Sequence, residues 1–132
     1  MNALDQLRLK ASYGTTALLW LNVLFSGLAG WLHPAAFSIW TLAASGVIAG
    51  LSTAVWSSDK AGPTTRVVHS MALAAQVGLL VYLFSGAAYQ IDMHMYFFAT
   101  LAICAVWIDW RAIVAYAGLV AVHHLALYVA MP

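Results

Sequence analysis

The chain has 132 residues, of which 64% are hydrophobic and only 7% are charged. Soluble domains carry about a quarter charged residues, so this composition excludes an ordinary water-soluble domain. The mean hydropathy of +0.89 is typical of an integral membrane protein. A net charge of +1 leaves no basic surface for nucleic acid, and the single cysteine, Cys104, excludes an internal disulfide and a multi-cysteine metal site.

Five apolar runs along the chain are candidates for membrane-spanning helices, since about 20 helical residues cross the hydrocarbon core of a bilayer. We therefore predict an all-α, polytopic transmembrane helical bundle that forms a single domain over residues 1–132. The spans are expected at about residues 13–31, 36–56, 67–88, 90–108 and 112–131. The fourth run is the shortest, and it approaches span length only if its helix begins near Tyr89.

The distribution of basic residues predicts the orientation of the chain. If successive spans alternate in direction, every basic residue falls on one side of the membrane, and the positive-inside rule makes that side the cytoplasm. These residues are Arg8, Lys10, Lys60, Arg66 and Arg111. We therefore expect a cytoplasmic N-terminus and a periplasmic C-terminus in a bacterial inner membrane, with the lipid bilayer as the main partner.

Histidines inside the predicted spans are the main functional candidates, because ionisable side chains are costly within a membrane. His94 lies fifteen residues before Asp109, which marks the turn between the last two spans. His123 and His124 lie fourteen and fifteen residues after that turn. At a rise of about 1.5 Å per residue, the three imidazoles are level to within roughly 2–3 Å on neighbouring antiparallel helices. We therefore predict that they converge.

Three imidazoles at one depth favour a metal site, because neutral imidazole is the commonest metal-binding side chain and suits copper, zinc and iron. Copper bound by His94, His123 and His124 is our first choice, and a b-type haem between two opposed histidines is the alternative. A proton-responsive cluster and plain hydrogen-bonded packing are the other interpretations. Four nearby side chains are candidates for a supporting role: Gln90, Asp92, Met95 and Tyr96.

The remaining polar residues of the spans have structural interpretations. Asp92 and Asp109 precede or begin apolar runs, so we expect each to cap the N-terminus of a helix. Asn22 and Gln76 lie in the middle of two spans, where interhelical hydrogen bonds are expected. His69 has no second intramembrane histidine at its depth, which argues against a second haem.

Three motifs follow one another in the second half of the chain: YQIDMHMYFFA at residues 89–99, DWR at 109–111 and AVHHL at 121–125. In this order and spacing, they resemble the N-terminal transmembrane sensor region of certain bacterial methyl-accepting chemotaxis proteins. Related regions occur ahead of diguanylate cyclase and phosphodiesterase modules. The resemblance covers about residues 67–132 and is loose before them.

The resemblance implies a membrane input module that passes a conformational signal to a cytoplasmic output domain. His94, His123 and His124 fall on the matching motif positions, as does Asp92. Many relatives carry a second histidine where this chain has Tyr96, which removes one candidate ligand. Relatives also continue into a sixth span and a cytoplasmic signalling region, whereas this sequence ends after the fifth predicted span.

We therefore expect a sensory module that binds copper or haem through intramembrane histidines and signals by helix rearrangement, as in chemotaxis. A small b-type cytochrome that exchanges electrons with quinone is the alternative, and an accessory subunit of a membrane complex is the third hypothesis. The sequence has no nucleotide-binding or hydrolase motif, and we assign no catalytic residue. Gly46 and Gly50 permit close helix contacts, for which packing within the chain is favoured over a homodimer.

Overall fold

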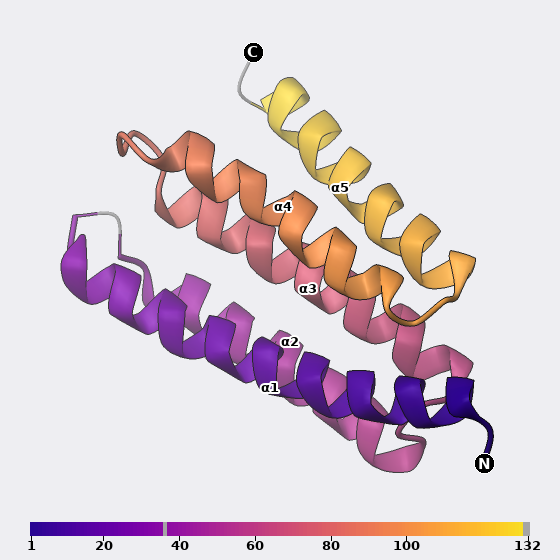
Figure 1. The fold of residues 1–132 in the computed structure, drawn as a ribbon. Coiled ribbons are helices and arrows are strands. Elements are labelled where there is room, and N and C mark those ends of the chain that lie inside the picture. The colour runs from indigo at the N-terminus through magenta and orange to yellow at the C-terminus, as the bar shows by residue number, and fades with distance from the viewer. Residues whose placement is uncertain (36, 131–132) are drawn as a thin grey trace.

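A computed structural model describes residues 1–35 and 37–130 of the chain and shows five α-helices there (Figure 1). The helices are α1 (Ala3–Leu32), α2 (Ile39–Ser58), α3 (Pro63–Leu83), α4 (Gln90–Ala105) and α5 (Trp110–Ala130). These described residues contain no β-strand, so the predicted all-α class is confirmed. The predicted first residue of the second span, Ala36, and the predicted last residue of the fifth, Met131, lie outside the described residues.

Four of these helices, α1, α2, α3 and α5, are long and apolar enough to cross a membrane. The fourth predicted span corresponds to α4, which has only 16 residues. At the α-helical rise it is about 24 Å long, somewhat less than the hydrocarbon core of about 30 Å. The described chain thus has the character of a membrane protein, with four helices that are long and apolar enough to span a bilayer.

Helix α3 is the central element of the bundle. It packs against α1 and α2 on one side and against α4 and α5 on the other, so that two three-helix groups share it. Successive helices run in opposite directions, and α5 diverges from α4 toward its C-terminal end (Figure 1). Only Ala112 and Tyr116 of α5 are buried, both in its first half.

The interior of the bundle contains many small and polar side chains together with a few large ones such as Trp107, while many other large apolar side chains face outward. This distribution suits a bilayer, where small residues let helix backbones approach closely and lipid covers the apolar exterior. Leu24 and Trp40, for example, are 71% and 80% exposed. The buried face of α1 repeats at intervals of three and four residues and consists of Ser12, Thr15, Leu19, Asn22, Ser26, Ala29 and Gly30.

The turn between α3 and α4 shortens the third helix relative to the predicted span. α3 ends at Leu83, whereas the apolar run extends to residue 88. Gly86 has a φ of +79°, which is accessible to glycine and breaks the helix. α4 then begins at Gln90 with Tyr89 in the N-cap position, so the predicted capping role of Asp92 is wrong. Asp92 lies within the first turn, because the helix begins two residues before it.

Basic residues gather with the α4–α5 turn at one end of the bundle. The guanidinium of Arg8 donates hydrogen bonds to the carbonyl oxygens of Trp107 and Ile108, each over 2.9 Å. The Arg66 guanidinium forms a salt bridge of 2.9 Å with Asp109. Asp109 also accepts a hydrogen bond of 3.0 Å from the amide of Arg111, which confirms its predicted role as a helix cap.

The two glycines of α2 do not serve packing within the described chain. A methyl group added at Gly46 or Gly50 would meet no described atom within 4 Å, so the expectation of close packing inside the chain is wrong for both. Their neighbours Thr41, Ser45 and Ala49 form the buried face instead. The glycines are half-buried and lie beside that face.

Candidate functional site

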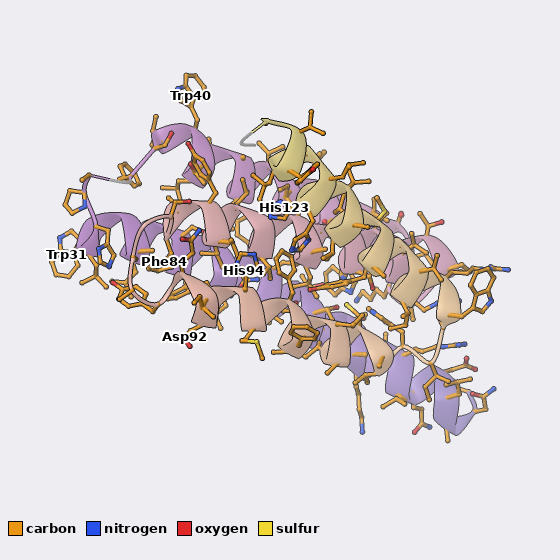
Figure 2. All side chains as sticks on the ribbon, turned by 90° about the horizontal axis from the view of Figure 1, so that it is seen from above. Trp31, Trp40, Phe84, Asp92, His94 and His123 are labelled. Carbon is orange, nitrogen blue, oxygen red and sulfur yellow. The ribbon has the colours of Figure 1, made fainter. Side chains whose placement is uncertain are left out.

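The three candidate histidines lie together between α4 and α5. The ring centres of His94 and His124 are 5.8 Å apart, and those of His123 and His124 are 5.4 Å apart. His94 and His123 also line the same cavity of about 390 Å³. Figure 2 shows these two side chains near each other in the middle of the bundle, with Asp92 directed away from them.

The aromatic ring of Phe97 packs against all three imidazoles. Its side chain is buried, and its ring centre lies 6.1 Å from that of His94, 5.7 Å from that of His123 and 6.0 Å from that of His124. Because Phe97 stands one turn below His94 on α4, it holds the three rings against an apolar surface on one side.

His123 also packs against the backbone of α3. A methyl group added at Gly78 would lie only 3.2 Å from Nδ1 and 3.3 Å from Cε1 of His123. Glycine at this position therefore makes the room that the imidazole occupies. The other ring nitrogen of His123, Nε2, is buried and has no hydrogen-bond partner among the described residues. An unpaired buried nitrogen is uncommon and costly, so a group that fills the adjacent cavity would be favoured there.

The tautomer of His124 follows from its backbone contact. Its Nδ1 atom lies 2.8 Å from the carbonyl oxygen of Val120. A carbonyl oxygen only accepts hydrogen bonds, so Nδ1 carries the proton and Nε2 of the neutral ring keeps a free lone pair. Metal-binding histidines are commonly fixed in this way, with one nitrogen on a carbonyl and the other free for the ion.

The spacing of the rings is compatible with shared binding of one ion. Two imidazoles whose nitrogens lie about 2.0–2.1 Å from a common ion have ring centres about 5–6 Å apart, depending on the angle between them. The separations of 5.4 and 5.8 Å fall in this range. However, the described residues contain no group of three histidine, cysteine or acidic side chains placed to hold one ion. The arrangement thus offers pairs of histidines, without the complete three-histidine set.

A haem fits the space less well than a single ion. Its two axial imidazoles must face each other across a flat macrocycle. The rings of His94 and His124 are inclined by 53° to each other, and Phe97 packs beside both of them, which leaves less space for a macrocycle than for an ion.

The four candidate supporting residues have separate positions. Gln90 lines the cavity of His94 and His123, and its side-chain oxygen accepts a hydrogen bond of 3.2 Å from the amide of Gly86. Tyr96 points toward α1, where its hydroxyl donates a hydrogen bond of 2.7 Å to Asn22. Met95 is 59% exposed and Asp92 is exposed as well. Of the four, only Gln90 lies at the histidine cavity.

His69 occupies a different position and is fully buried. Its Nε2 atom lies 3.3 Å from the carbonyl oxygen of Ser52, to which it donates, and its Nδ1 atom lies 2.9 Å from the hydroxyl of Thr15. Both ring nitrogens therefore have partners on neighbouring helices. His69 is a packing residue that joins α3 to α1 and α2.

Sequence reasoning missed two residues of the site, Gly78 and Phe97. Both lie in long apolar runs, where one glycine or phenylalanine among many gives no signal of its own. The position of Phe97 beside His94 could have been predicted, because Phe97 lies three residues after His94 and so on the same helix face. Gly78 becomes visible only when α3 is placed against α5.

Comparison of the chain with protein-family models, curated proteins and solved structures found no match. The geometry of the histidines is therefore the basis of the functional argument.

Proposed function

We propose that the chain is a membrane-embedded sensory input module that binds a copper ion between α4 and α5 through His94, His123 and His124. The observation that carries this proposal is the buried, unpartnered Nε2 of His123 beside a cavity that His94 also lines. Imidazole nitrogens are good ligands for copper, and the nearby side chains supply no competing charge at the cavity apart from the histidines themselves.

The separation of the three ligands supports a sensing role. His124 is spaced to share an ion with either His94 or His123. Binding by all three histidines requires α4 and α5 to move relative to each other. Copper then binds the closed arrangement better than the open one, and this difference in affinity shifts the population toward closure. The likeness of residues 89–125 to chemotaxis sensor regions supports the same interpretation, with signalling as the output.

The proposal includes five spans in a bacterial inner membrane, with α4 as the short span. Arg8 and Arg66 both contact the α4–α5 turn, so the basic residues share one end of the bundle with the N-terminus. The positive-inside rule makes that end cytoplasmic. The histidine cluster then lies in the periplasmic half of the membrane, which suits a metal that arrives from outside the cytoplasm.

Metal analysis of the detergent-solubilised chain tests the proposal. We expect copper to be retained after dialysis and to raise the midpoint of thermal unfolding, while the absorption spectrum lacks haem bands. His123→Ala and His94→Ala should each abolish both effects without changing the helix content. His33→Ala is the matched control, because His33 follows α1 and packs against Tyr89 rather than against the three histidines.

Copper uptake that is unchanged in His123→Ala would refute the proposal. Equal loss in His33→Ala would show adventitious binding to any histidine, and a haem spectrum with quinol turnover would establish the cytochrome alternative instead.

A further inference from the structure

Helices α1 and α4 face each other across a hollow. Both pack on α3, but among the described helices they share no extended interface with each other. A cavity of about 400 Å³ lies between them, lined mainly by apolar side chains such as Phe25 of α1 and Met93 of α4. Two polar side chains also line it, Asn22 of α1 and Tyr96 of α4.

One hydrogen bond crosses this hollow. The hydroxyl of Tyr96 donates to the side-chain oxygen of Asn22 over 2.7 Å, and Asn22 is only 2% exposed. A bond of this length in an apolar setting is well formed, and it is lost once the oxygens separate beyond about 3.5 Å. Displacement of α4 by about 1 Å from α1 is therefore enough to break it.

Asn22 connects Tyr96 to the polar core of the other helices. The amide of Asn22 donates to the side-chain oxygen of Gln76 on α3 over 3.2 Å. The amide of Gln76 in turn lies 3.0 Å from the carbonyl oxygen of Leu19 on α1 and 3.2 Å from that of Ser45 on α2. A change at Tyr96 thus reaches α1, α2 and α3 through contiguous hydrogen bonds.

Tyr96 and the histidine cluster occupy different faces of the same short helix. His94 and Tyr96 are two residues apart, which is about 200° around an α-helix. His94 faces His124 of α5, while Tyr96 faces Asn22 of α1. Because α4 is a rigid element, a shift that carries His94 toward α5 also pulls Tyr96 relative to α1.

We infer that Tyr96 is a positioning residue that couples the histidine cluster to α1 through Asn22. This inference rests on the proposed function. Copper draws α4 toward α5, no extended interface with α1 holds α4 back, and the Tyr96–Asn22 hydrogen bond transmits displacements smaller than about 1 Å to α1 and α2. The polar pair serves as the transmitting contact, and Tyr96 is no ligand of the ion.

Spin-label distance measurements on the full-length chain test this coupling. Labels are attached to cysteines introduced at the exposed positions Ala17 of α1 and Val47 of α2, while the native Cys104 is buried. Both labels are remote from the histidines, so a copper-dependent change in their distance reports transmission. We expect the change in the otherwise unaltered protein and its loss in Tyr96→Phe, which still binds copper.

Two controls separate coupling from a general loss of stability. Tyr13→Phe also removes a hydroxyl that takes part in a hydrogen bond, with Lys60, and should keep the copper-dependent change. Asn22→Ala should abolish the change, and combination with Tyr96→Phe should have no additional effect, because both substitutions break the same contact.

A metal-free measurement tests the contact without copper. Labels at Ala17 of α1 and Ala99 of α4, both exposed, should give a narrow distance distribution that broadens in Tyr96→Phe. A copper-dependent change that persists in Tyr96→Phe would overturn the coupling and leave the proposed function intact. Absence of copper uptake by the unaltered protein would overturn both.

Discussion

Gly78 offers a test of the histidine cluster that leaves every proposed ligand in place. The imidazole of His123 lies directly over this glycine, and an added methyl group would be 3.2 Å from Nδ1 and 3.3 Å from Cε1. Ordinary contacts between non-bonded heavy atoms are about 3.5–4.0 Å, so Gly78→Ala forces the ring to move by a few tenths of an ångström. The substitution therefore displaces a proposed ligand without removing it.

The expected change in stability is small because two effects oppose each other. Alanine favours the helix over glycine by about 1 kcal/mol. Crowding in a packed interior typically costs about 1–3 kcal/mol. The free energy of unfolding of Gly78→Ala should therefore fall by no more than about 2 kcal/mol. Copper binding should weaken by about 10–100-fold, as is typical when the surroundings of a metal ligand are disturbed.

Gly118→Ala is the matched control for this substitution. Gly118 lies on α5, the helix that carries His123, and an added methyl group there meets no described atom within 4 Å. It should gain about 0.5–1 kcal/mol of stability and leave copper affinity unchanged. The assay is a copper titration with a competing chelator, followed by unfolding of the same samples. Equal copper affinity of the two variants would refute the placement of His123 against α3.

Three further predictions concern the bundle itself. Gln76→Leu should lower the free energy of unfolding by about 2 kcal/mol, because Gln76 bonds to three residues and interhelical hydrogen bonds in membranes average about 0.6 kcal/mol each. An unchanged free energy of unfolding would contradict its role in the core. Arg66→Met should cost about 3 kcal/mol by leaving Asp109 unpaired, and added Asp109→Asn should recover part of that cost in the same unfolding assay. Gly50→Ala should be tolerated in the monomer, so loss of a dimer on size-exclusion chromatography would show that α2 contacts a second copy.

The all-helical class was predictable because hydropathy alone determines it. Long apolar runs must satisfy their backbone hydrogen bonds internally, and helices do so within one segment. The helix ends were less predictable. An apolar run does not stop where the helix stops, and α3 ends at Leu83 because Gly86 turns the chain within a stretch that remains apolar. The start of α4 at Gln90 agrees with the predicted fourth span, and it places Asp92 inside the first turn rather than at the cap.

The polar core was predictable in part. Asn22 and Gln76 were expected to form interhelical hydrogen bonds, and they bond to each other. Their third partner, Tyr96, was placed near the histidines from its position in the sequence alone. Sequence distance does not specify the helix face, and two residues of separation direct Tyr96 toward α1. The helical period was sufficient to predict this orientation once α4 was assigned.

The depth of each histidine in the bundle depends only on its separation from the α4–α5 turn, so it could be predicted without knowledge of the other helices. Their lateral arrangement depended on α3, since α5 packs on α3 and His123 fits over Gly78. Lateral contacts of this kind depend on how a helix is turned about its own axis. The nearly uniform hydrophobicity of α5 does not specify this orientation. This explains why the three histidines were predicted to converge, whereas only Gln90 of their four predicted supporting residues lines the cavity of His94 and His123.

The attachment of α5 gives a physical reason for placing a responsive site at its second half. Tyr116 fastens α5 to α4, because its hydroxyl lies 2.8 Å from the carbonyl oxygen of Phe97 and 2.5 Å from the hydroxyl of Thr100. His123 and His124 follow about two turns later, beyond the last buried residue of the helix. A ligand bound there would act beyond the fixed point and draw α4 and α5 together, whereas a site at the level of Tyr116 would act where the two helices are already bonded.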